Sequence, residues 1–167
     1  DAGVGYNERN QFNLRVIQPV ELADGLTSDL GASFQIGELV NEGNVNNGDD
    51  GTAWAGAVHA VNQLDNWKLA LQLSYYNYDI DGSDLINRGF YDFYADIATE
   101  GYVPAVSLSY YHETSDILWL DYVIPYVEYS SIVKNGETAA GADFKDSELW
   151  TFGAAWAHNG WYIYTEY

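Results

Sequence analysis

Clustered carboxylates are the first groups in this sequence whose spacing suggests chemistry. Residues 44–51 and 79–84 are rich in Asp, Asn and Gly, and calcium prefers such oxygen ligands. Neither run has the EF-hand order of ligands, glycine and closing Glu, and turns need the same residue types. We therefore expect no metal, and any calcium site would be structural. The carboxylates concerned are Asp49, Asp50, Asp79, Asp81 and Asp84.

The three histidines offer a second, weaker kind of chemistry. His59, His112 and His158 lie in different predicted strands, and each could be paired on paper with a serine and an acid to imitate a hydrolase triad. The chain has no G-x-S-x-G nucleophile motif, nucleotide loop, thiol pair or zinc spacing. We therefore expect neither an enzyme nor a bound cofactor.

Charge and composition narrow the classes of function. The chain has 6 Lys and Arg against 25 Asp and Glu, a net charge of -19. Nucleic-acid phosphates demand a cationic surface, so a nucleic-acid partner is not expected. There is no Cys, which excludes disulfides and thiolate metal sites and suits an exported protein. No window approaches the ~18 uncharged apolar residues of a membrane helix. Residues 1–8 lack a signal-peptide pattern, so residue 1 is expected to be a mature terminus or an arbitrary cut.

The carboxylates and histidines must be positioned by secondary structure, and the clearest predicted strand is at residues 67–76. Trp67, Leu69, Leu71, Leu73 and Tyr75 alternate with small or polar residues, a period of two that predicts a strand with one apolar face. The apolar face begins in Trp and ends in Tyr. Its span of roughly 20 Å, when tilted, matches the lipid-facing band of an outer-membrane barrel with two aromatic girdles.

Seven further alternating segments accompany this strand. We expect strands at about residues 11–22, 29–39, 52–61, 67–79, 102–113, 117–133, 147–158 and 161–167. Short links at 23–28, 62–66, 114–116 and 159–160 alternate with long ones at 40–51, 80–101 and 134–146. This pattern predicts an antiparallel sheet of hairpins. Short turns on one side and long loops on the other are typical of outer-membrane barrels.

The apolar faces of the later strands follow the same rule with one exception. Trp150, Phe152 and Trp156 share a face in 147–158, and Trp161 and Ile163 share one in 161–167. In 117–133 the apolar face includes Trp119, but Asp121 falls on that side as well. A soluble sandwich or lipocalin-like barrel is the alternative, with the apolar face pointing inward.

Strand parity predicts an incomplete barrel. If the short turns are periplasmic, both chain ends lie on the side of the long loops, whereas a complete barrel usually keeps both in the periplasm. The last strand is about seven residues, below the roughly nine to eleven that cross a membrane. We therefore expect an open sheet, an interior piece of about eight strands from a larger barrel. A complete, small eight-stranded barrel is the alternative.

Several short segments resemble bacterial porins of the phosphate-selective (O and P) superfamily. They are RVIQPV at residues 15–20, GASFQIG at 31–37, GFYDF at 89–93 followed by EG at 100–101, and GAA at 153–155 with YIY at 162–164. The resemblance implies an outer-membrane channel of about sixteen strands, usually trimeric, through whose lumen solutes pass. It does not imply phosphate selectivity, because members selective for anions line the pore with Arg and Lys, which are scarce here.

Candidate pore residues follow from the faces and from the longest loop. A basic side chain inside a barrel more often pairs with a lumen carboxylate, so we expect Arg15 to pair with one such as Glu128 or Glu166; the alternative is that Arg15 guides an anion. The acidic, aromatic loop 80–101 is the candidate constriction, with packing on the barrel rim or against a neighbouring protomer as the alternative. The pore-lining candidates are Arg15, Lys68, Gln72, Tyr76, Tyr126, Glu128, Tyr164 and Glu166. The constriction candidates are Arg88, Tyr91, Asp92, Phe93, Asp96 and Glu100.

Taken together, the sequence predicts an all-β, antiparallel transmembrane β-barrel segment in which residues 1–167 form a single unit. The expected function is passive diffusion of small hydrophilic solutes, with cations preferred or with weak selectivity. The expected partners are outer-membrane lipid, the solutes or ions, and two further copies in a homotrimer. The alternative is a soluble or small-barrel β binding module that recognises carbohydrate or a partner through aromatic and acidic loops.

Overall fold

The computed structural model describes the backbone of residues 5–41, 49–90 and 93–167, and the side chains of all these except 88–90, 93 and 94. The strands are β1 (Tyr6–Ala23), β2 (Leu26–Asn41), β3 (Gly51–Leu64), β4 (Trp67–Asp79), β5 (Leu85–Phe90), β6 (Phe93–Ala98), β7 (Glu100–Tyr110), β8 (His112–Glu113), β9 (Tyr122–Asn135), β10 (Ser147–His158) and β11 (Trp161–Glu166). No helix in the described part of the chain is long and apolar enough to cross a membrane.

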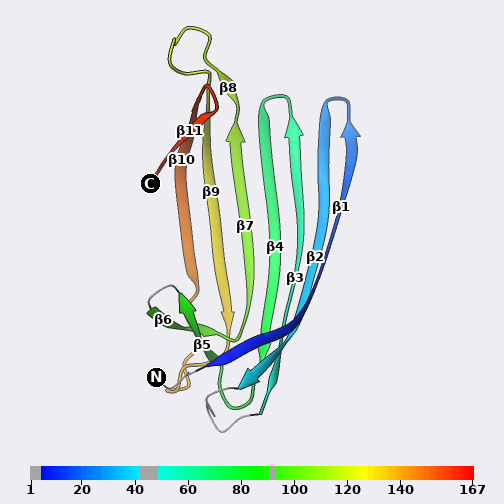
Figure 1. Ribbon diagram of the computed structural model, residues 1–167, viewed down its shortest axis with the longest axis vertical. Coiled ribbons are helices and arrows are strands. Elements are labelled where there is room, and N and C mark those ends of the chain that lie inside the picture. The colour runs from blue at the N-terminus through cyan, green and yellow to red at the C-terminus, as the bar shows by residue number, and fades with distance from the viewer. Residues whose placement is uncertain (1–4, 42–48, 91–92) are drawn as a thin grey trace.

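The main sheet is antiparallel and follows the chain from one edge to the other (Figure 1). Its order is β1-β2-β3-β4-β7-β9-β10-β11, with the short β8 pairing to β9. The all-β, antiparallel prediction is therefore confirmed. β1 and β11 form the two edges, and no pairing joins them among the described residues. The expected open sheet is thus also confirmed, because closure would require these two strands to pair.

Tight turns join the two strands of three hairpins, all at the same end of the sheet. We call this end the turn end and the opposite end the loop end. The turn residues are Asp24 with Gly25, Asp65 with Asn66, and Asn159 with Gly160. Asn159 and Gly160 have φ values of 46° and 82°, and two consecutive positive φ angles match the strand twist of a two-residue hairpin. The first two links are thus shorter than the predicted 23–28 and 62–66.

The predicted strand 117–133 is wrong in its first five residues. β9 begins at Tyr122, and residues 114–121 form a longer turn. Trp119 is 65% exposed in this turn rather than part of an apolar strand face. The turn is closed by its own backbone, since the Thr114 amide donates to the Asp121 carbonyl at 3.0 Å. Asp121 broke the alternation because it lies outside the strand.

The long segment between β4 and β7 contains a hairpin that the sequence analysis treated as a loop. β5 and β6 form a separate two-stranded sheet. Ile86 is 1% exposed and packs in a cluster with Tyr6, Leu39 and Ala53. Each strand has only six residues, too few to show a clear period. The hairpin is instead held by contacts with residues far away in the sequence.

Candidate functional site

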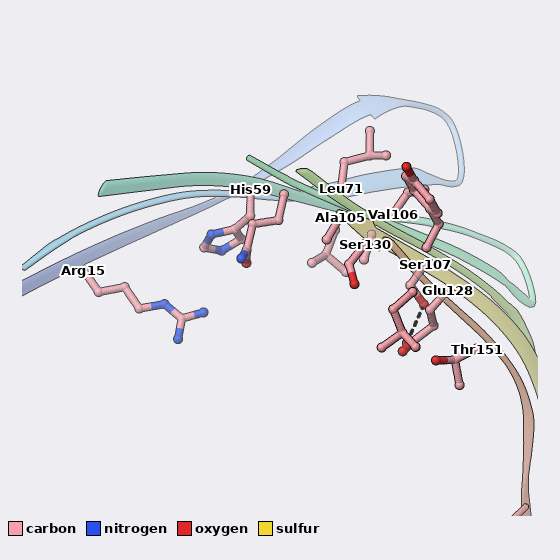
Figure 2. Close-up of a pocket in the computed structure, with 14 residues that line it drawn as sticks. Arg15, His59, Leu71, Ala105, Val106, Ser107, Glu128, Ser130 and Thr151 are labelled. Carbon is pink, nitrogen blue, oxygen red and sulfur yellow. Dashed lines mark hydrogen bonds between the residues drawn. The ribbon is translucent and has the colours of Figure 1, made fainter. Parts of the chain in front are cut away.

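The sheet is curved, and its two faces differ in chemistry. Figure 2 shows Arg15, His59, Ser107, Glu128, Ser130 and Thr151 on the inner side of the curve and Leu71 on the outer side. Cross-strand register extends the inner side over the sheet, because His59 is opposite Gln72, Gln72 opposite Ala105, and Ala105 opposite Ser130. Neighbours in register point to the same side of a sheet. The concave face therefore carries mostly small and polar side chains.

All eight pore-lining candidates lie on this concave face. Arg15 and Gln72 line one hollow of about 380 Å³, together with His59 and Ser107. Lys68, Tyr126, Glu128, Tyr164 and Glu166 line a second hollow nearer the turn end. Tyr76 lines a third at the loop end. His59, Ser107, Ser130 and Thr151 also lie on this face, and register counted from the neighbouring strands would have identified them.

The charged groups of the concave face do not form the expected ion pair. Arg15 is on β1, whereas Glu128 and Glu166 are on β9 and β11, so four strands separate Arg15 from Glu128. Glu128 accepts a hydrogen bond from the Ser107 hydroxyl at 3.0 Å, and Glu166 accepts one from the Tyr126 hydroxyl at 2.5 Å. The predicted pairing of Arg15 is therefore not found. A curved sheet holds these charges apart across the groove instead.

Three glycines keep the concave groove open by letting rings lie flat on the sheet. Gly31 is opposite His59, Gly101 opposite Tyr76, and Gly153 opposite Tyr126. A Cβ at Gly153 would lie 2.4 Å from the Tyr126 ring, and one at Gly31 would lie 2.1 Å from the His59 ring. A larger residue would push each ring off the backbone, into the groove.

The convex face is apolar and carries two groups of aromatic side chains. At the loop end, Trp54 and Tyr102 lie with ring centroids 4.9 and 4.8 Å from Tyr75. At the turn end, Trp67 and Tyr110 lie 4.7 Å apart. Between them the face consists largely of aliphatic side chains such as Leu71 and Leu73, which are 43% and 49% exposed. No second layer of described residues covers this face.

The constriction candidates are divided by the structure. Asp96 lies on the β5–β6 hairpin, where its carboxylate accepts a hydrogen bond from the side-chain amide of Asn87 at 2.9 Å. Glu100 lies on the convex side, the face that also carries Tyr102. Its carboxylate accepts hydrogen bonds from the Tyr75 hydroxyl at 2.7 Å and from the side-chain amide of Asn135 at 2.8 Å. Tyr91 and Asp92 lie outside the described residues, as do the side chains of Arg88 and Phe93.

The five calcium candidates are not brought together. The Asp50 carboxylate accepts a hydrogen bond from the backbone amide of Asn41 at 2.8 Å, and the Asp84 carboxylate accepts one from the backbone amide of Glu137 at 2.8 Å. Asp49, Asp79 and Asp81 complete the set, and no group of three or more His, Asp or Glu side chains within the described ranges is placed to hold a metal ion. Asp50 and Asp84 act as caps for loop backbone.

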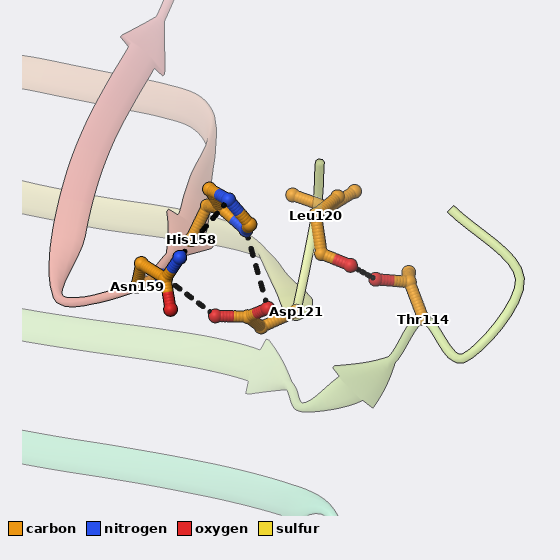
Figure 3. A network of polar contacts seen from close by, with 5 residues as sticks. All are labelled: Thr114, Leu120, Asp121, His158 and Asn159. Atoms are coloured by element: carbon orange, nitrogen blue, oxygen red, sulfur yellow. Dashed lines mark hydrogen bonds and ion pairs between the residues drawn. The ribbon is translucent and has the colours of Figure 1, made fainter. Parts of the chain in front are cut away.

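The histidines lie in three separate surroundings. His59 is on the concave face, and His112 stacks on Tyr110 with ring centroids 6.4 Å apart. His158 is at the turn end, where its Nδ1 lies 3.3 Å from Asp121 Oδ1 (Figure 3). The backbone amide of Asn159 donates to Asp121 Oδ2 at 2.7 Å. Asp121 therefore links the turn 114–121 to the β10–β11 turn.

The same contacts set the ionisation of Asp121. The hydrogen bond from the Asn159 amide, followed by the bond and charge interaction with His158, holds the pKa of the Asp121 carboxyl below its usual value of 3.8. Hydrogen bonds to a carboxylate favour its charged form. The turn end thus depends on an ionised Asp121.

Comparison with known proteins adds no assignment, since no family model, curated protein or solved structure matches the chain. Function is therefore inferred from the chemistry of the two faces of the sheet.

Proposed function

We propose that this chain forms part of the wall of a transmembrane β-barrel channel in a bacterial outer membrane. The channel allows passive diffusion of small hydrophilic solutes and ions. One observation carries the proposal: the sheet curves so that its polar face is concave and its apolar face is convex (Figure 2). A water-filled barrel in lipid needs this arrangement, with polar residues inside and apolar residues outside.

The exposure of the convex face supports contact with lipid. Large apolar side chains on five neighbouring strands, β1, β2, β3, β4 and β7, are each more than one third exposed: Leu14, Phe34, Val58, Leu73 and Leu108. Continuous exposed apolar surface of this kind marks a membrane or protein interface. The aromatic groups at both ends of the face correspond to the girdles that flank the lipid-facing band of outer-membrane barrels.

The curvature argues against the soluble alternative. A soluble barrel or sandwich encloses its apolar face, so that face would have to be concave or covered by a second sheet. Within the described chain, the β5–β6 hairpin and segment 136–146 lie over the concave face only at the loop end. The buried apolar cluster around Ile86 is confined to that end, and the rest of the concave face, with Arg15, Gln72 and Glu128, does not form the continuous apolar core that a soluble barrel needs.

The charges on the concave face favour cations. Cross-strand register places Glu21 and Asp29 on the same face as Glu128 and Glu166. The basic residues of that face are Arg15, Lys68 and, at the loop end, Lys134. Rings of carboxylates favour cation passage, and the overall charge of -19 adds to that preference.

Reversal potentials in planar bilayers under a salt gradient test this proposal. We expect the complete channel, of whose wall this chain is a part, to be cation-selective, and Glu128→Lys to shift its reversal potential toward anions because Glu128 faces the groove. Glu148→Lys is the matched control, because it makes the same change of charge at a position of β10 that faces the convex side. Absence of channel activity, anion selectivity in the unmodified protein, or equal shifts for the two variants would contradict the proposal.

A further inference from the structure

The loop end of the concave face contains a pocket of about 570 Å³. It lies between the sheet, the β5–β6 hairpin and the segment 136–146, which Figure 1 shows gathered at the same end of the sheet. Its volume falls within the usual range of small-molecule sites. None of the residues that line it belongs to the undescribed part of the chain.

The pocket is held in shape by backbone hydrogen bonds. The Tyr78 amide donates to the Thr99 carbonyl at 2.7 Å, and the Thr99 amide donates to the Asp84 carbonyl at 2.9 Å. The Asp84 carboxylate accepts from the Glu137 amide at 2.8 Å. These bonds connect the base of the hairpin to β4 and to segment 136–146, so the three walls are fixed relative to one another.

The walls are aromatic and apolar. Tyr76 and Tyr78 are successive residues on the concave side of β4, with ring centroids 5.9 Å apart. Phe144 from segment 136–146 and Ile97 from the hairpin also line the pocket. Such walls suit a flat or apolar ligand body, which gains free energy by leaving water.

The polar groups of the pocket favour an anion. Lys134 and Lys145 both line it, which brings two of the chain's six basic residues into one place. Lys134 Nζ donates to the Lys145 carbonyl at 2.9 Å and to the Ser147 hydroxyl at 2.7 Å. An ammonium has three N–H donors, so one remains, and no described carboxylate bonds to Lys134 Nζ. The one carboxylate of the lining, Asp96, already accepts from Asn87.

From this arrangement we propose that the loop-end pocket binds a small organic carboxylate with an aromatic or apolar body. The ligand's carboxylate accepts a charge-assisted hydrogen bond from Lys134, and its body packs against Tyr76 and Phe144. Binding to the pocket does not require the proposed function. Only the role of the pocket as the entrance through which the ligand reaches a channel rests on that function. A binding site at the entrance would retain this class of solute in a lumen that otherwise favours cations.

Equilibrium binding to the detergent-solubilised protein, followed by calorimetry, tests the site without any measurement of conductance. The probes are benzoate, benzyl alcohol, acetate and benzylamine. We expect benzoate to bind at least tenfold more tightly than the other three, because only benzoate combines a ring with a negative charge. Equal or tighter binding of benzylamine, or no binding of benzoate, would overturn the proposal.

Variants assign the contacts. Lys134→Met should weaken benzoate binding about tenfold and Lys134→Arg less than threefold, while Lys68→Met, at the other end of the concave face, should have no effect. Asp96→Asn should strengthen benzoate binding because it removes a nearby negative charge, and a gain of this kind cannot result from misfolding. If Asp96→Asn and Lys134→Met both leave binding unchanged, the site is wrong. Channel activity without benzoate binding would reject this site alone, and benzoate binding without channel activity would reject the channel alone.

Discussion

The convex and concave faces of the sheet are built from alternate residues of the same strands, yet they meet different requirements. On the convex face, Leu71 and Leu73 are part of an exposed apolar surface of the kind found at membrane or protein interfaces. On the concave face, Gln72 and Ser74 bond to each other at 2.9 Å and remain in contact with open space. The proposed function requires side chains one residue apart to face different solvents, with the strand backbone as the boundary.

The faces also use glycine differently. Gly153 on the concave face is covered by the Tyr126 ring, whereas a Cβ at Gly56 on the convex face would have the Ser33 carbonyl oxygen, at 3.9 Å, as its nearest neighbour. The concave face thus depends on missing side chains to stay hollow. At Gly56 the convex face has room for a side chain.

The largest expected effect comes from placing the same charge on each face. Leu71→Arg should lower the free energy of unfolding by about 2–4 kcal/mol in lipid vesicles, because the guanidinium would lie at the middle of the lipid-facing band. Gln72→Arg should change it by less than about 0.5 kcal/mol, since the side chain remains in water. Urea titration of the folded protein in vesicles measures both. Equal costs, or a greater cost for Gln72→Arg, would show that the faces are assigned the wrong way round.

A smaller effect is expected from filling a glycine on each face. Gly153→Val should cost about 1–3 kcal/mol, because its Cβ would overlap the Tyr126 ring and force it to move. The ring would enter the groove, so single-channel conductance should also fall. Gly56→Val should be neutral or stabilise by about 0.5 kcal/mol, because glycine is unfavourable within a strand. A loss of stability with Gly56→Val as large as with Gly153→Val would mean that the convex face is packed as closely as the concave one.

The smallest effect is expected at the turn end, where neither face is involved. The pKa of Asp121 is lower in the folded protein than its usual value of 3.8. The contribution of Asp121 to stability is therefore complete above that usual value and is lost as the pH falls through the lower folded pKa. Asp121→Asn should flatten the acid side of the stability profile and leave the effects of Leu71→Arg and Gly153→Val unchanged. Identical acid profiles for the unmodified and Asp121→Asn proteins would exclude this role of Asp121.

Much of the fold could be predicted because its signals are local. A period of two in residues 67–76 identifies both a strand and its apolar face, and the positions of tight turns follow from pairs such as Asn159 and Gly160. The placement of all eight selected side chains, from Arg15 to Glu166, opposite the apolar face follows from the same alternation. Asp121 breaks the alternation of the predicted strand 117–133, and the structure places it just before the first residue of β9. The break in the pattern therefore marks the strand boundary.

The sequence by itself determined that the chain forms hairpins in one antiparallel sheet and that the two faces differ, because alternation and turn formation depend only on near neighbours. The tertiary structure decided which face is concave, since curvature results from the twist and register of all the strands together. It also decided that the β5–β6 hairpin folds over the concave face, that Glu100 joins Tyr75 on the other face, and that Arg15 stays far from Glu128. These are contacts between residues distant in the chain, and no local pattern encodes them.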